Sequence, residues 1–335
     1  MKPKVVFLPG DTRMGGVMAN MQSLVSSRLS DRYDLSISNR NDALYLKSQP
    51  NPVDAIVFNL GCSWSELPNL WLLGRGRTKI IIRESNYCEG FERLQIPSVE
   101  RFRLMLKLSY QCADRVIAVS HAQANWMRTH RLVADAKLME IASCPNVERM
   151  FSVPAKVRGH PLVLGAYGRF APQKGFESLV RAMGQLPAER FQLLLGGSGE
   201  LESDLKHLAA QANNIHFLGR ITDVPEFLAK CDAVIIPSCW EPSGNVLVES
   251  KAAGKPTIVS DVDGLPEQID RCGLVVPPND PTQLAEAIAS LPTRDLESWG
   301  RRARASVTKA WETHVCHWES LLVELTSSRG VTASR

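Results

Sequence analysis

Short apolar runs alternate with amphipathic stretches along the whole chain. The runs are continuous, and they lie at residues 4–8, 54–60, 78–82 and 115–119 and, in the second half, at 162–166, 191–195, 215–218, 233–236 and 257–259. A continuous run, unlike an alternating one, predicts a strand that is covered on both faces. The stretches between the runs, such as 16–29, 175–183 and 224–230, carry apolar residues at helical spacing. This alternation predicts doubly wound, right-handed parallel α/β sheets.

An irregular, polar segment at residues 145–161 separates two similar halves, and 335 residues is a length typical of roughly two domains. We therefore expect two Rossmann-like domains facing a cleft. The expected boundaries are 1–155 and 156–295, followed by a C-terminal helix at 296–327 that packs back on the first domain and a disordered tail at 328–335. Ligands of such sheets bind at the carboxyl ends of the strands, so the site is expected between the domains.

The apolar content of 44% excludes a mainly disordered chain. No apolar run approaches the ~20 residues of a membrane-spanning helix. The first run is too short for the core of a signal peptide, so we expect a cytoplasmic protein. The cysteines form no CxxC pair and the histidines no HxxxH pattern, so no metal site is expected.

The net charge of +4 is unevenly distributed, since residues 1–150 hold 20 Lys and Arg against 14 Asp and Glu. The excess is too small and too scattered for a nucleic-acid-binding protein. The stretch 98–111 predicts an amphipathic helix with basic residues at Arg101, Arg103 and Lys107. We expect either peripheral contact with an anionic membrane on its inner face or a sheet-covering helix with a solvated basic edge.

The segment that points most clearly to chemistry is residues 237–249, Pro-Ser-Cys-Trp-Glu-Pro-Ser-Gly-Asn-Val-Leu-Val-Glu. It follows an apolar run and leads into a predicted helix, with Glu241 in the loop and Glu249 one turn into the helix. The small residues between them predict a helix N-terminus whose N–H groups suit a diphosphate or a sugar hydroxyl; they are Ser243, Gly244, Asn245 and Val246. A carboxylate at Glu249 can accept both hydroxyls of a ribose.

Arg169 and Lys174 lie in the segment 167–175, Tyr-Gly-Arg-Phe-Ala-Pro-Gln-Lys-Gly. Cleavage of a sugar–diphosphate bond builds negative charge on the leaving phosphate. Two cations fixed beside it stabilise the transition state more than the ground state, which is work that a divalent metal does elsewhere.

Together these segments resemble the retaining glycosyltransferases of family 4, which have the GT-B fold. The resemblance rests on Glu241-x7-Glu249 and on motifs in matching order at 167–175, 196–199, 217–219, 252–256 and 259–267. It is looser in the first half, where it rests on Gly15-Gly16-Val17, on 113–120 and on Pro145-Asn146. Many family members carry a histidine near residues 83–86, and here Ser85 or Asn86 takes its place.

The resemblance implies a metal-independent enzyme without a cofactor. It would transfer a sugar from a nucleotide-diphosphate sugar, with a UDP-sugar favoured over a GDP-sugar, to a saccharide or lipid-linked acceptor in polysaccharide or glycolipid synthesis. It implies catalytic roles for Arg169, Lys174 and Glu241, the last at the donor sugar. It also implies donor contacts for Glu249, for the helix start at 243–246, and for Gly15, Gly16 and Gly197.

Other interpretations remain open at this point. The chain is alternatively a nucleotide-sugar 2-epimerase on the same fold, or a binding protein that is catalytically silent. His121, at a predicted strand end, and Trp240, beside Glu241, are secondary candidates for sugar contact, although surface capping and packing are the commoner roles of such residues. The string Asp261-Val262-Asp263 is not expected to bind a metal.

Overall fold

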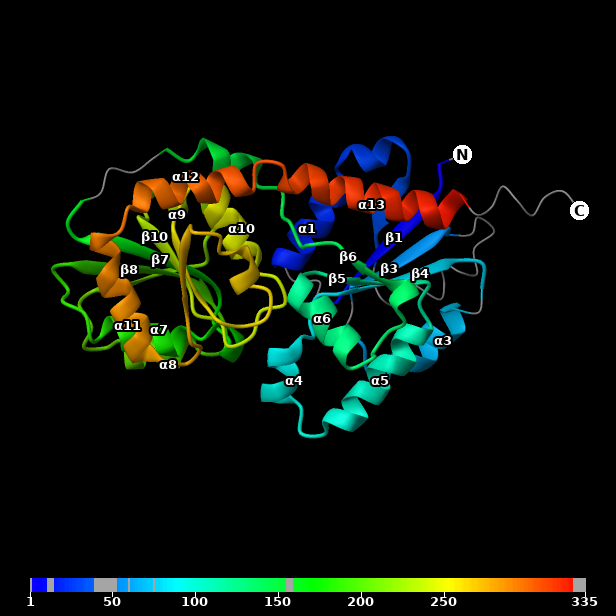
Figure 1. Cartoon of the computed structure of the whole chain (residues 1–335), viewed down its shortest axis with the longest axis horizontal. Helices are drawn as coiled ribbons and strands as arrows, with labels where there is room; N and C mark the ends of the chain where they lie inside the picture. Colours follow the sequence, from blue (N-terminus) through cyan, green and yellow to red (C-terminus); the bar gives the residue numbers. More distant parts are fainter. Residues whose placement is uncertain are drawn as a thin grey trace, which may run out of the picture. The chain divides into compact units, whose positions relative to one another are not determined.

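A computed structural model describes residues 2–10, 15–38, 53–59, 61–74, 76–154 and 159–327. The chain divides into two compact units (Figure 1). Unit 1 comprises residues 1–145 together with 311–335, and unit 2 comprises residues 146–310. The first unit is therefore built from both ends of the chain.

The sheet of unit 1 has six parallel strands in the order β2-β1-β3-β4-β5-β6. They are β1 (Lys4–Pro9), β2 (Asp34–Ile37), β3 (Ala55–Asn59), β4 (Lys79–Glu84), β5 (Arg115–Ala118) and β6 (Leu138–Glu140). Successive side chains of a strand point to opposite faces. On one face Phe7 and Ile81 pack with α1 (Gly16–Val25) and α13 (Ala310–Ser327). On the other, Leu8 and Ile82 pack with α3 (Leu67–Gly74), α5 (Val99–Gln111) and α6 (His121–Thr129).

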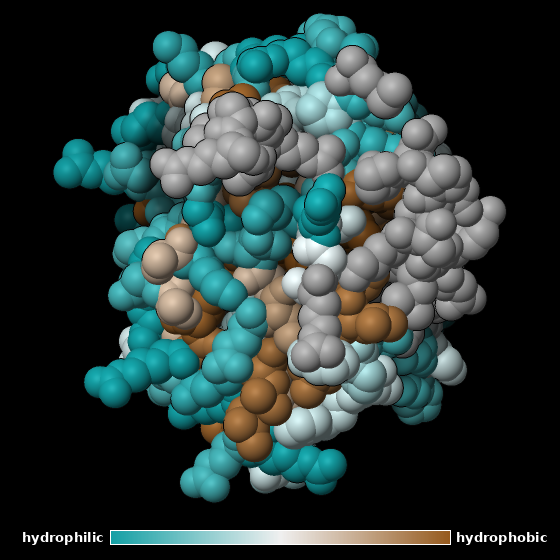
Figure 2. Space-filling model, turned by 90° about the vertical axis from the view of Figure 1, so that its right-hand side faces the viewer, coloured by the Kyte–Doolittle hydropathy of each residue, from teal (hydrophilic) through white to brown (hydrophobic). Residues whose placement is uncertain are grey.

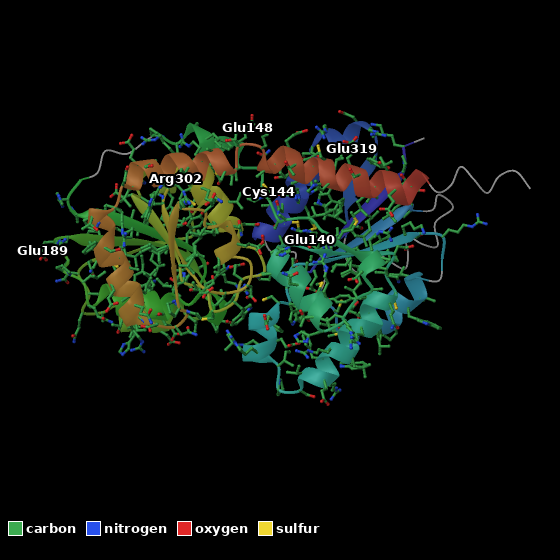
Figure 3. The ribbon with its side chains drawn as sticks, in the orientation of Figure 1. Glu140, Cys144, Glu148, Glu189, Arg302 and Glu319 are labelled. Carbon is green, nitrogen blue, oxygen red and sulfur yellow. The ribbon has the colours of Figure 1, made fainter. Side chains whose placement is uncertain are left out.

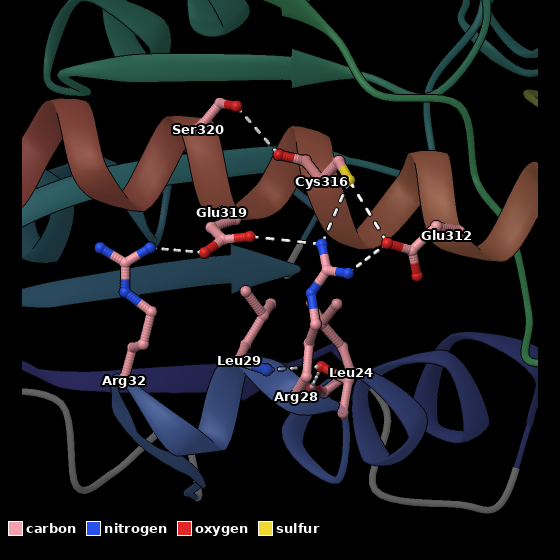
Figure 4. A network of polar contacts seen from close by, with 9 residues as sticks. Leu24, Arg28, Leu29, Arg32, Glu312, Cys316, Glu319 and Ser320 are labelled. Atoms are coloured by element: carbon pink, nitrogen blue, oxygen red, sulfur yellow. Dashed lines mark hydrogen bonds and ion pairs between the residues drawn. The ribbon is translucent and has the colours of Figure 1, made fainter.

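Helix α13 is held on unit 1 by apolar packing and by ion pairs. Trp318 is buried and its ring centroid lies 5.7 Å from that of Phe7. At the edge of the helix, Arg28 forms ion pairs with Glu312 and Glu319, and Arg32 pairs with Glu319 at 2.5 Å (Figure 4). Arg28 is the first residue of the short 3-10 helix η1 (Arg28–Asp31), and Arg32 is its C-cap. The apolar contacts dominate the binding of this helix, because exposed ion pairs contribute little.

The sheet of unit 2 has six parallel strands in the order β12-β11-β10-β7-β8-β9. They are β7 (Leu162–Arg169), β8 (Phe191–Ser198), β9 (Ile215–Gly219), β10 (Ala233–Ile236), β11 (Thr257–Ser260) and β12 (Gly273–Val276). The helices of this unit are α7 (Phe176–Met183), α8 (Glu202–Leu208), α9 (Val224–Ala229), α10 (Asn245–Ala252), α11 (Pro281–Ser290) and α12 (Leu296–Ser306). Apolar side chains of α7, α8, α11 and α12 form one core with the strands.

Every strand predicted from a continuous apolar run is present, and three strands were missed. The missed strands β2, β6 and β12 are short and lie at sheet edges, where one side of the strand is unpaired and burial is incomplete. The segment expected as one helix at 296–327 is two helices, α12 in unit 2 and α13 in unit 1. Thr308 between them bonds its hydroxyl back to the carbonyl of Arg304 at 3.2 Å, a contact that bends or ends helices.

The tail expected to be disordered lies outside the described residues. The division between the units falls at residues 145/146, ten residues before the predicted boundary. No helix in the described part of the chain has the length and apolar character needed to cross a membrane.

Candidate functional site

The predicted segments of unit 2 meet where the order of its strands reverses. The chain builds β8 and β9 on one side of β7 and then returns to place β10 on the other side. The backbone N–H of Cys239, after β10, donates to the carbonyl of Gln173, after β7, at 2.8 Å. Gly175 has φ of +63°, and a Cβ there would lie 2.0 Å from the carbonyl oxygen of Pro237. Such a switch point is where open α/β sheets bind ligands.

Lys174 and Glu241 form an ion pair across these two loops. The side chains are 22% and 11% exposed, so the pair is largely shielded from water. The hydroxyl of Ser238 also donates to the Glu241 carboxylate, at 3.3 Å. The structure thus brings together two of the three predicted catalytic residues.

The loop that carries Glu241 is fixed by the segment after β11. The backbone N–H of Glu241 donates to the Asp263 carboxylate at 2.9 Å, and the backbone carbonyl of Glu241 accepts from the N–H of Gly264 at 3.2 Å. The Gln268 amide donates to the carbonyls of Ser243, at 2.6 Å, and Gly264, at 2.7 Å. These contacts position Glu241 through its backbone and leave its carboxylate to Lys174 and Ser238.

Helix α10 begins after Gly244, at a position that other residue types do not fit. Gly244 has φ of +91°, a conformation that residues with a Cβ rarely adopt. A Cβ there would lie 2.7 Å from Leu265 and 3.4 Å from the Glu241 side chain. As the N-cap, Gly244 supplies no side-chain acceptor to the first turn, which comprises Asn245 and Val246 among others. A helix N-terminus favours an anion such as a phosphate, because the positive end of the helix dipole lies there.

Glu249 lies in the second turn of α10, as predicted, and is half-buried. Its carboxylate accepts a 2.5 Å hydrogen bond from the hydroxyl of Tyr167, at the end of β7. Desolvation raises the pKa of Glu249 to about 7, against the opposing effect of the Tyr167 hydrogen bond. The Tyr167 ring packs edge-on against Phe227, with ring centroids 5.1 Å apart, and this contact fixes the hydroxyl.

The remaining predicted residues of unit 2 have simpler surroundings. Arg169 is exposed at the end of β7, and no ion pair joins it to another described residue. Gly197 has φ of +144°, and a Cβ there would lie 1.9 Å from the carbonyl oxygen of Gly168. The close approach of β7 and β8 is enough to require a glycine at position 197. The predicted contact of Gly197 with a donor therefore stays a prediction. Trp240 is half-buried, and its carbonyl accepts from Gln173 at 3.3 Å.

Gly15 and Gly16 belong to unit 1, where they are exposed at the start of α1. Of the two residues at the place of the family histidine, Ser85 is half-buried and Asn86 is exposed. The preceding Arg83 is buried and donates to Ser143 at 2.9 Å, and burial lowers its pKa to about 10. None of these residues shares a unit with the Lys174–Glu241 pair.

His121 is the first residue of α6 and is mostly exposed. Its Nδ1 lies 3.1 Å from the carboxylate of Glu140. Glu140 is at the end of β6 and is labelled in Figure 3. Arg128, two helix turns further along α6, contacts the same carboxylate at 2.9 Å. The predicted contact of His121 with an acceptor stays a prediction.

Sequence reasoning missed three residues that contact Glu241 or Glu249, namely Tyr167, Ser238 and Asp263. Each lies inside a segment that the motifs had singled out, which is the only signal that the sequence carries for them. The Asp263 carboxylate accepts from the backbone N–H of Glu241. In the described ranges no group of three or more His, Cys, Asp or Glu side chains is placed to hold a metal ion.

Residues 161–293, most of unit 2, match the protein family described as "Glycosyl transferases group 1". A GDP-mannose-dependent monoacylated alpha-(1-6)-phosphatidylinositol monomannoside mannosyltransferase of Corynebacterium glutamicum is 35% identical over 181 residues. That alignment covers 49% of this chain and 46% of the relative. Less than half of the relative's length is therefore matched.

Two solved structures cover nearly the whole chain. Sucrose-phosphate synthase from Thermosynechococcus elongatus aligns with a TM-score of 0.79 and 20% identity over 98% of this chain and 100% of its own. Anabaena Alr3699/HepE, in complex with UDP and glucose, aligns with a TM-score of 0.72 and 18% identity over 95% of this chain and 98% of its own. The two parallel, doubly wound sheets are those of GT-B glycosyltransferases, which confirms the predicted fold class.

Proposed function

We propose that this chain is a retaining glycosyltransferase of family 4, which uses a nucleotide-diphosphate sugar as donor. One observation carries the proposal. The Lys174–Glu241 pair and the half-buried Glu249 lie around the start of α10, whose N-cap is Gly244, at the switch point of the unit 2 sheet. The match of residues 161–293 to group 1 glycosyltransferases supports it.

In this proposal the donor lies across the start of α10. The N–H groups of the first turn and the cations Lys174 and Arg169 bind the diphosphate, and Glu249 accepts the ribose hydroxyls. A diphosphate competes with Glu241 for Lys174, which frees the Glu241 carboxylate to accept a hydroxyl of the donor sugar. The proposal also includes the donor contacts predicted for Gly15 and Gly16.

The proposed transfer follows from this placement. The bond between the sugar anomeric carbon and the diphosphate oxygen breaks, and the acceptor oxygen bonds to the same face of that carbon. The acceptor proton passes to the leaving phosphate oxygen. Lys174 and Arg169 stabilise the charge that develops on the diphosphate, so the step needs no divalent metal and no covalent nucleophile.

A UDP-sugar is the first choice of donor and a GDP-sugar the second. The similar Anabaena structure holds UDP and glucose, and the Corynebacterium relative is named as GDP-mannose-dependent. The proposed acceptor is a saccharide or a lipid-linked saccharide in polysaccharide or glycolipid synthesis. The proposed location is the cytoplasm, where nucleotide sugars are made.

The first experiment measures thermal stabilisation of the full chain by UDP, GDP and ADP with a chelator present. A nucleotide at ~100 times its dissociation constant adds about 2.7 kcal/mol to the free energy of unfolding. We expect one nucleotide to stabilise the wild type, and Glu249→Ala to lose the effect. Glu226→Ala, which removes an exposed carboxylate of the same unit, is the matched control and should keep it.

Turnover then separates the alternatives. Loss of nucleotide sugar only when an acceptor is present, with retained anomeric configuration in the product, supports the transferase. Conversion of the donor to its 2-epimer without an acceptor would assign the epimerase instead. Transfer that survives in both Lys174→Ala and Glu249→Ala would show that the assigned site is wrong.

A further inference from the structure

A groove lies on the surface of unit 1 between α3 and α5. Its volume is about 580 Å³, within the range of small-molecule sites. The lining is mainly apolar and includes Trp64, Leu67 and Trp71 from the α3 side and Leu108 and Cys112 from the α5 side. Neither helix belongs to the candidate site of unit 2, so the groove is a separate feature.

Exposed apolar side chains continue from the groove onto the surrounding surface. Trp64 is 41% exposed, Trp71 51%, Leu72 49% and Leu104 51%. These are four of the seven large apolar side chains exposed in the described part of the chain. Figure 2 views the molecule from the side on which α3 lies in Figure 1, and hydrophobic residues gather in the lower half of that view. Apolar surface that gathers around a groove marks a binding site more often than scattered residues do.

Positive charge lies at both ends of the groove. On α5, Arg101, Leu104, Leu108 and Gln111 follow helical spacing along one stripe, and α3 carries no charged residue. At one end the Arg101 guanidinium lies 5.8 Å from the centre of the Trp64 ring. At the other, Lys137 donates to the carbonyl of Gln111 at 2.9 Å.

This distribution differs from the basic helix edge that the sequence predicts. Arg103 forms a two-pronged ion pair with the buried Glu92, with Nε at 2.9 Å from one carboxylate oxygen. Its charge is therefore neutralised within the unit. The face of α5 beside α3 therefore carries Leu104 and Leu108, with Arg101 at the start of this stripe.

We propose that this groove binds a hydrocarbon chain of an anionic membrane lipid, with the charged headgroup held near Arg101 or Lys137. Exposed leucines beside the groove favour hydrocarbon over a sugar, which would leave them in water. Indole rings at a groove mouth suit the boundary between lipid chains and water. The cations match the charge of anionic headgroups. The proposal does not depend on the proposed function, because it uses only α3, α5 and their surroundings.

The test is binding of the full chain to vesicles, without any activity assay. We expect cosedimentation with vesicles of phosphatidylcholine and phosphatidylglycerol, and affinity lower by about tenfold for phosphatidylcholine alone. Phosphatidylcholine brominated in its acyl chains should quench tryptophan fluorescence in the wild type. The variant carrying both Trp64→Phe and Trp71→Phe should lose this quenching.

Two single variants and one control locate the binding. Trp71→Glu and Leu104→Glu should each weaken vesicle binding by about tenfold or more, since each places a charge where apolar surface is buried. Leu218→Glu is the matched control, because Leu218 is 44% exposed but lies in unit 2. Leu104 points largely to solvent, so Leu104→Glu keeps the test valid if Trp71→Glu does not fold.

Three results would overturn the proposal. Equal binding by the two glutamate variants and Leu218→Glu would place the contact elsewhere. Binding that is abolished by salt and gives no quenching by brominated chains would show adsorption to headgroups only. Full competition by dissolved glycerol phosphate would show that the groove region binds a free anion without a lipid chain.

Discussion

Each unit holds a carboxylate that is hydrogen-bonded to a tyrosine, and the two carboxylates differ in what else they bind. Glu84 of unit 1 accepts from the hydroxyl of Tyr110 at 2.9 Å, and Glu249 of unit 2 accepts from that of Tyr167 at 2.5 Å. Desolvation raises the pKa of both carboxyls to about 7. The pKa therefore does not distinguish Glu84 from Glu249.

The two carboxylates differ in the number of hydrogen bonds that they accept. Glu84 is fully buried and also accepts from the backbone N–H groups of Asn86, at 2.9 Å, and Tyr87, at 3.0 Å. Glu249 is half-buried, and Tyr167 is its one donor among the described residues. A carboxylate has about four acceptor positions. Glu84 is therefore occupied in holding the loop after β4, whereas Glu249 has capacity left for a ligand. A raised pKa alone does not identify a binding group.

The largest expected effect is on the stability of unit 1. Glu84→Ala leaves three donors without their acceptor, and we expect it to lower the free energy of unfolding by at least about 3 kcal/mol. Glu249→Ala removes the acceptor of one donor at a half-buried position and should cost less than about 1 kcal/mol. Urea denaturation of both variants measures the difference. Equal losses would mean that the two carboxylates play the same structural role.

The second effect is on nucleotide affinity, and here the change at Glu249 should matter more than the change at Glu84. Glu249→Ala should weaken binding of the preferred nucleotide about 30- to 100-fold, because two hydrogen bonds from ribose to a charged group are lost. Glu84→Gln, which keeps an acceptor for the loop, should bind as the wild type does. Isothermal titration calorimetry measures both. A loss of affinity in Glu84→Gln would contradict the division of roles.

The third effect is the pH dependence of that binding. Glu249 accepts ribose hydroxyls best when ionised, so affinity should be full above its pKa of about 7 and fall about tenfold between pH 8 and pH 6. The Tyr167 hydrogen bond lowers this pKa, so Tyr167→Phe should move the midpoint to higher pH. Glu249→Gln is the control and should show a flat profile. A profile unchanged by Glu249→Gln would assign the titration to another group.

The smallest effect compares the two tyrosines. Tyr110→Phe removes a donor from a carboxylate that water cannot reach, and we expect a loss of about 1 kcal/mol in stability. Tyr167→Phe should cost less, because water can replace the lost donor at the half-buried Glu249. Thermal unfolding of the two variants without nucleotide tests the order. The reverse order would show that Glu249 is the more enclosed group.

The sequence predicts the fold well where burial dominates. Strands such as β4, whose Ile80, Ile81 and Ile82 are buried, are continuous apolar runs. The edge strands β2 and β6 lack that signal, and β12 carries only the short run 274–276. The motifs also predict that Glu241, Lys174 and Glu249 lie in one domain. They do not predict the Tyr167–Glu249 contact, because the two residues are 82 positions apart and meet only when the fold brings α10 beside the end of β7. The Tyr110 donor to Glu84, 26 positions away along the chain, is hidden for the same reason.

The division of unit 1 between the two ends of the chain has a consequence for synthesis on the ribosome. Unit 2 is encoded without interruption, so it is complete once residue 310 has left the exit tunnel. Unit 1 begins first, but its core lacks Trp318 and Leu321 until the last helix emerges. The half that is translated first is therefore the half that finishes folding last. A premature stop codon near residue 310 would damage the N-terminal unit more than the one it directly follows.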